Sequence, residues 1–237
     1  MNRSVRFAIA GTAVAACASV GLATPVWAAG SASTSLGARA LTEIKANAAS
    51  AISLRLSALT TAISAVNNNV WLTSSDKSTL LNTLDGDQSN LTALAPKIQA
   101  DTTIPQARTD AQSIVLTYRV FALAIPQVRL SAATDDIIGG ALVRLGDAKN
   151  RLSGLLSGVD SSKDTPAVQA LMSDLANRIQ TVTTATSGLS ASILALTPAE
   201  YDANYTLLSA PRQTLVTSGY NLGEARNDIE TVVGDLK

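Results

Sequence analysis

The sequence contains no histidine and a single cysteine, Cys17. Histidine is the usual general base and the commonest metal ligand, so its absence argues against most imidazole-dependent catalysis and metal binding. One cysteine cannot form a disulfide within the chain, so no such cross-link stabilises the fold. Aromatic residues make up 3% of the chain and charged residues 15%, which leaves few side chains for recognition by stacking or by charge.

Positive and negative charges balance, with 18 Lys and Arg against 18 Asp and Glu. Nucleic-acid binding requires clustered positive charge that neutralises phosphates, and nothing in this balance favours it. We therefore expect no nucleic-acid partner. Because histidine is missing and the one thiol lies near the N-terminus, we also expect no cofactor and no metal.

The N-terminal 28 residues have the layout of a secretory signal peptide. Arg3 and Arg6 precede an apolar run over residues 7–23, and Val26-Trp27-Ala28 follows it. A positive segment, an apolar segment and a small-residue cleavage site characterise such peptides. We expect cleavage after Ala28, so that Ala29 begins the mature chain. Both arginines would be lost, which leaves 16 basic against 18 acidic residues and a formal net charge of −2.

Cys17 supports a second interpretation of this segment. Val14-Ala15-Ala16-Cys17 resembles the site at which bacterial lipoproteins are cut and acylated. The apolar run continues past Cys17, however, and this favours simple secretion. We expect a secreted, extracellular protein that can associate with the cell envelope, with lipid anchoring at Cys17 as the alternative. No later apolar stretch is expected to be long enough to span a bilayer.

Beyond residue 35, apolar residues recur every three or four positions, which predicts amphipathic helices. Residues 29–35 are small and polar and are expected to form a flexible lead-in. Five helices are predicted, near 36–69, 74–100, 105–158, from 166 to at least 187, and 198–235. No segment alternates with a period of two over a useful length, so the predicted fold class is all-α.

The third predicted helix, residues 105–158, is nearly twice as long as its neighbours and would run about 80 Å. Pro126 removes an internal hydrogen bond and Gly139-Gly140 weakens the helix, so we expect a kink or break at one of them. The simplest packing is an elongated pair of antiparallel three-helix bundles, residues 36–130 and 131–237, that share this helix. A single up-and-down bundle, with the third helix folded back, is the alternative.

Three patterns suggest chemistry, but each fails a closer test. Asp85–Asn90 resembles the start of a calcium loop but lacks its later glycine and glutamate. Ser74-Ser75-Asp76-Lys77 contains the Ser-x-x-Lys of penicillin-binding enzymes without their companion motifs. Asp135-Asp136 diverge by about 100° on a helix, and the Glu224 and Asp228 pair belongs to a charged surface. We predict that the protein is not an enzyme.

The few aromatic residues are candidates for a partner surface, because aromatic side chains concentrate binding energy. Beyond the N-terminal segment they are Trp71, Tyr118, Phe121, Tyr201, Tyr205 and Tyr220. Tyr118 and Phe121 also fall on the apolar stripe of a predicted helix, and Trp71 lies at a turn. We therefore expect packing within the fold to be the main role of these three.

Residues Tyr118–Gln127, with the Asp-rich and Ala-rich helices that flank them, resemble uncharacterised secreted helical proteins of actinobacteria. This resemblance implies export and an all-α architecture, and it brings no activity with it. We expect a non-enzymatic helical bundle that acts as a structural or interaction module at the cell envelope, with an unidentified protein or envelope component as its partner.

Two alternatives stay open. One is a lipid- or membrane-binding bundle of amphipathic helices, and the other is an envelope enzyme that uses carboxylates alone. Membrane contact is expected only if Cys17 is lipidated or the helices are membrane-active.

Overall fold

A computed structural model describes residues 32–158 and 161–236. Within these ranges the chain is helical and contains no strand, so the all-α prediction is confirmed. The elements are α1 (Ala32–Asn68), α2 (Ser74–Ala100), α3 (Ile104–Leu116), the π-helix η1 (Val120–Ala124), α4 (Ile125–Asp136), the π-helix η2 (Ile137–Leu142), α5 (Val143–Ser157), the 3-10 helix η3 (Ser161–Lys163), α6 (Pro166–Thr186), α7 (Leu189–Leu194), α8 (Pro198–Ala203) and α9 (Ser209–Asp235).

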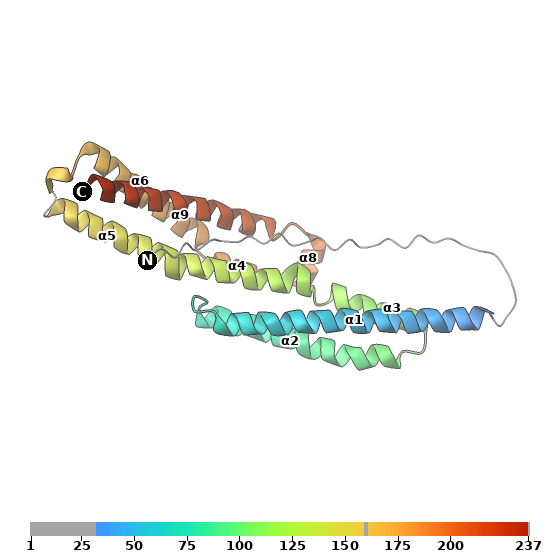
Figure 1. The fold of residues 1–237 in the computed structure, drawn as a ribbon. Coiled ribbons are helices and arrows are strands. Elements are labelled where there is room, and N and C mark those ends of the chain that lie inside the picture. Colours follow the sequence, from blue (N-terminus) through green and yellow to red (C-terminus); the bar gives the residue numbers. More distant parts are fainter. Residues whose placement is uncertain (1–31, 159–160, 237) are drawn as a thin grey trace.

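The helices form an elongated molecule with two bundles that overlap at its middle (Figure 1). Helices α1, α2 and α3 make one antiparallel bundle, and α5, α6 and α9 make the other. Helix α4 lies between them and packs against α1, α2, α7 and α9. The predicted pair of three-helix bundles sharing a long middle helix is therefore observed, and the single folded-back bundle is not.

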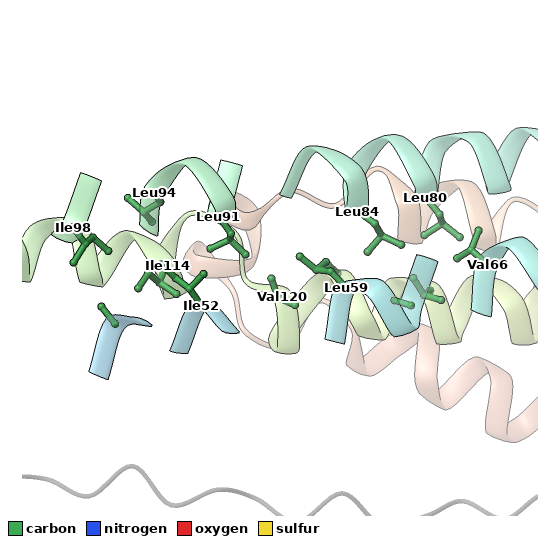
Figure 2. Packing of buried hydrophobic residues seen from close by; sticks show 14 of the residues in the cluster. Ile52, Leu59, Val66, Leu80, Leu84, Leu91, Leu94, Ile98, Ile114 and Val120 are labelled. Atoms are coloured by element: carbon green, nitrogen blue, oxygen red, sulfur yellow. The ribbon is translucent and has the colours of Figure 1, made fainter. Parts of the chain in front are cut away.

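The core of the first bundle follows a seven-residue spacing. In α1 the fully buried side chains Ile52, Leu59 and Val66 are seven residues apart, and in α2 Leu84, Leu91 and Ile98 repeat in the same way. A seven-residue apolar repeat keeps one seam of each helix against its neighbour. Ile114 of α3 and Val120 of η1 complete this cluster (Figure 2). The apolar stripes read from the sequence account for this core.

The second bundle has a thinner core. Its buried seam joins Val168, Leu175 and Val182 of α6 to Ser218, Ala225 and Val232 of α9, again at seven-residue spacing. α5 adds only Leu152 and Leu156 to the seam as buried apolar residues. Leu155, between them on the same helix, is 43% exposed. Small buried side chains such as Ser218 and Ala225 allow α6 and α9 to approach closely.

Ser218 is an exception in this seam, and its replacement by alanine is expected to stabilise the protein by about 1 kcal/mol. Its side chain is 1% exposed and its Oγ has no hydrogen-bond partner. Removing an unpaired buried hydroxyl relieves its desolvation cost, and alanine also favours the helix. Denaturant unfolding followed by circular dichroism measures the change. Ser173→Ala, on the exposed side of α6, controls for helix propensity and should give a smaller gain; equal gains would contradict this account.

The long middle helix breaks at Arg119, between α3 and η1, and not at Pro126 or Gly139-Gly140 as predicted. Arg119 has φ 43° and ψ 34°, a left-handed conformation that few non-glycine residues adopt. Pro126 instead lies in the first turn of α4, where its missing N–H costs little. Gly139 and Gly140 lie in η2. Both suspected positions therefore border or contain π-helical turns, but the helix itself is interrupted at Arg119.

The helix ends also differ from the sequence expectation in two places. Helix α1 begins at Ala32, inside the segment 29–35 predicted to be a lead-in. The segment 198–235, predicted as one helix, forms two: α8, which has six residues and opens on a capping box of Thr197 and Glu200, and α9, which starts at Ser209.

Two helical stretches, Leu36–Asn68 and Ile104–Ser157, are long and apolar enough to cross a membrane by length and composition. The expectation that no stretch after residue 28 meets that criterion was therefore wrong. Core helices of soluble proteins pass the same test, and both stretches supply buried side chains to the bundle cores.

Candidate functional site

Buried polar side chains gather where the two bundles overlap. Those near the middle are Gln127, Ser131, Thr134 and Asp135 of α4, Thr186 at the end of α6, and Ser190 of α7. Among the described residues, Ser218 is the one other buried polar side chain. We call the region formed by α4, α7 and the parts of α1, α2 and α9 that pack on α4 the central joint. Burying polar groups costs free energy unless they are hydrogen-bonded, so their arrangement here requires explanation.

Two carboxyl groups from different helices meet in the central joint. Asp135 of α4 is 4% exposed, and its Oδ2 accepts a hydrogen bond from the backbone N–H of Thr73 at 3.0 Å. The carboxyl group of Asp76, in the first turn of α2, is the charged neighbour of Asp135, and the two can hydrogen-bond when one of them is protonated. Asp76 Oδ2 in turn accepts the hydroxyl of Ser190, on α7, at 2.5 Å. One cluster thus connects α2, α4 and α7.

This environment changes the ionisation of Asp135. Burial is the largest cause and raises the pKa of its carboxyl group, because the charged form loses its hydration. The Thr73 N–H lowers that pKa, while the charge and hydrogen bond of Asp76 raise it. The net direction is upward. Two neighbouring carboxyl groups repel when both are charged, so Asp135 retains its proton to a higher pH than an isolated aspartate.

Gln127 holds α7 against α4 on the other side of the joint. Its side chain is 5% exposed, and its Nε2 donates to the carbonyl oxygens of Ile193 at 2.8 Å and Leu196 at 2.9 Å. The last carbonyl groups of a helix have no partner within the helix. Gln127 donates to carbonyl oxygens at the C-terminal end of α7, so a side chain of α4 caps α7.

Arg119 connects the break in the long helix to α8 and to the turn that follows it. Its Nε donates to Asp202 Oδ1 at 2.5 Å, and the side chain is 13% exposed. Its guanidinium group also lies 5.9 Å from the centre of the Tyr205 ring, which packs edge-on against Tyr201 at 5.6 Å. The ion pair raises the pKa of Arg119 and keeps it charged. The left-handed backbone of Arg119 is thereby held by contacts from a distant segment.

Two more aromatic side chains are covered by arginines. Arg55 lies over Phe121 at 5.3 Å from the ring centre, and Arg144 lies over Trp71 at 5.6 Å. Phe121 is 53% exposed, so the expectation that it packs in the core was wrong. Trp71 is 40% exposed and lies against Gly140, where an added Cβ would come within 3.4 Å of the ring.

The remaining aromatic candidates lie apart from one another. Tyr118 is half-buried and packs against the first core, as expected. Burial raises its pKa, with the charge of Asp87 as a second cause. Tyr220 is 67% exposed on α9. Of the six candidates, the structure brings Tyr201 and Tyr205 into contact with each other.

The other patterns weighed in the sequence lie within helices α2 and α9. Residues 85–90 lie inside α2 and are helical, so they make no calcium loop. Residues 74–77 form the first turn of the same helix. Asp228 lies 3.3 Å from Arg178, and burial raises the pKa of Asp228 while the arginine partly opposes this. Ala28, Ala29 and Cys17 lie outside the described residues.

Two surface grooves, each of about 350 Å³, lie along the second bundle. One runs between α6 and α9 and is lined mainly by apolar and threonine side chains, with Gln213 and Asn221 at its edge. The other lies between α5 and α9 beside Arg144, Asp147 and Arg151. Among the described residues, no group of three or more Cys, Asp or Glu side chains is arranged to hold a metal ion.

Comparison with known proteins finds no matching family model, no matching curated protein and no matching solved structure. The functional argument therefore rests on the chain itself. Sequence reasoning missed Gln127 and the pairing of Asp76 with Asp135. The available signal was the polar run Gln127, Ser131, Thr134, Asp135, whose spacing of three and four places it on one helical face.

Proposed function

We propose that this chain is a secreted, non-enzymatic helical bundle that acts as a structural or interaction module at the cell envelope. The observation that carries the proposal is a pair of well-exposed aromatic rings fixed by arginines near the break in the long helix. Phe121 is 53% exposed beside Arg55, and Tyr205 is 64% exposed beside Arg119. Aromatic side chains held in place before binding lose little entropy when a partner covers them.

The elongated shape supports a structural role for the same molecule (Figure 1). Both bundle cores are lined mainly by apolar side chains, while the exposed sides of the helices carry Ser, Thr, Asn and Gln. The N-terminal segment of the sequence has the layout of an export signal. A chain of this kind can span a distance at the envelope and present a partner surface partway along its length.

Site-specific photo-crosslinking in the producing cells tests this proposal. A photoreactive phenylalanine analogue replaces Phe121 or Tyr205, and Thr92, on the exposed side of α2, is the matched control position. We expect a discrete adduct with an envelope component from the first two positions and none from Thr92. The absence of an adduct at both aromatic positions, or a specific catalytic turnover by the purified chain, would overturn the proposal.

A further inference from the structure

We propose that the Asp76–Asp135 pair is a proton-operated latch in the central joint, which ties α2, α4 and α7 together while one proton is shared and releases α7 when that proton is lost. The proposal does not depend on the identity of a partner. It concerns how firmly the two bundles are connected, because α2 belongs to the first bundle and α7 continues directly from α6 of the second.

The geometry places both carboxyl groups at contacts between elements. Asp135 Oδ2 accepts from Thr73, which is the N-cap of α2, and Asp76 Oδ2 accepts from Ser190 of α7. With one proton between them, each carboxyl group keeps its contact to a neighbouring helix and also bonds to the other. With no proton, two negative charges face each other in a place where Asp135 is almost fully buried.

Among the described residues, Asp76 is the one charged group that shifts the pKa of Asp135, and it raises it. Other ionisable side chains on the packed elements include Lys77 on α2, Arg129 and Asp136 on α4, Arg144 on α5 and Arg212 on α9. The C-terminal half of α1 carries Arg55, which lies over Phe121, and α7 carries none. Lys77 donates to the carbonyl oxygen of Asn67, and Arg144 covers Trp71.

Helix α7 is set apart from α6, while Gln127 ties its C-terminal end to α4. Helix α7 has six residues, and Gly188 before it adopts φ 68°, a left-handed turn that separates it from α6. Ser131, one helical turn before Asp135, is fully buried and its Oγ has no partner. Loss of the shared proton therefore weakens the attachment of a short helix, α7. This helix lies beside a core in which the Ser131 hydroxyl has no hydrogen-bond partner.

Hydrogen exchange of the full chain, measured by mass spectrometry from pH 5 to pH 8, tests the latch. After correction for the intrinsic pH dependence of exchange, we expect protection of the amides of α7 and of the first turn of α2 to fall about tenfold. Asp135→Asn should remove most of this fall, because an amide can donate to Asp76 and accept from Thr73 at every pH. Asp136→Asn, its neighbour outside the pair, should behave like the unmodified protein.

Three results would overturn the latch. The first is protection of α7 in the unmodified protein that does not change with pH. The second is an unchanged pH dependence in Asp135→Asn. The third is a fall of the same size in Asp76→Asn, which keeps an acceptor for Ser190 and removes the charge pair from the other side. Because the first measurement needs no substitution, the proposal stays falsifiable even if a variant fails to fold.

Discussion

Replacing Asp87 with leucine is expected to stabilise the protein by about 2 kcal/mol at pH 7.5 and to raise its Tm by roughly 4–8 °C. Asp87 lies midway between Leu80 and Leu94, seven residues from each, at a position that the repeat assigns to the core. Burial raises its pKa to about 6, so the ionised carboxylate is disfavoured in the folded state. The side chain is half-buried, so solvent screening discounts the full cost of that shift to about 1–2 kcal/mol. Leucine removes this cost and adds apolar contact.

The raised pKa of Asp87 also predicts how the free energy of unfolding changes with pH. Between its ordinary value of 3.8 and about 6, Asp87 binds a proton more tightly in the folded than in the unfolded chain. Stability from this group therefore falls as pH rises through that range and stays lower above it. The unmodified protein should melt at a higher temperature at pH 5 than at pH 7.5, and Asp87→Leu should reduce the difference.

Asp85→Leu is the matched control for this experiment, since Asp85 lies two residues earlier on the exposed side of α2. It should change the free energy of unfolding by less than about 0.5 kcal/mol. Thermal melts followed by circular dichroism at several pH values provide the measurement. A destabilised Asp87→Leu variant, or an equal gain from Asp85→Leu, would show that residue 87 does not face the core.

The helices could be predicted because their core positions repeat. Residues such as Leu84, Leu91 and Ile98 recur with helical spacing, and capping residues such as Thr73 and Thr197 mark helix starts. The break at Arg119 could not be predicted in this way. Sequence rules assign breaks to proline and glycine, whereas Arg119 is held in a left-handed conformation by Asp202, 83 residues away. A contact so distant in the sequence leaves no local pattern.

The contacts within the central joint could not be predicted from sequence spacing either. The two neighbouring acids at 135 and 136 diverge on a helix, which argues against a shared target. That argument could not show that Asp135 instead meets Asp76, 59 positions earlier. Nor could it distinguish the buried Gln127 from the many exposed glutamines. Spacing predicts which residues share a helical face, but which neighbour covers that face depends on tertiary packing.

Replacing Gln127 with glutamate is expected to destabilise the protein by about 3–5 kcal/mol at pH 7.5. The two side chains have nearly the same shape, so little packing is lost. The amide, however, donates to the carbonyl oxygens of Ile193 and Leu196, and a carboxylate would place negative charge against both acceptors in a buried position. At pH 5 part of the loss should be recovered, because a protonated carboxyl group can donate one of the two hydrogen bonds.

Gln112→Glu, on the exposed side of α3, introduces the same charge and should leave stability within about 0.5 kcal/mol of the unmodified protein. Denaturant unfolding gives the free energies, and hydrogen exchange at residues 189–196 reports whether α7 separates before the bundles unfold. If Gln127→Glu unfolds within 1 kcal/mol of the unmodified protein, Gln127 does not cap α7. If the loss is large but exchange at α7 matches the rest of the chain, the joint unfolds together with both bundles. In that case the two bundles unfold as one cooperative unit. Both bundles pack on α4, so unfolding of one removes contacts from the other.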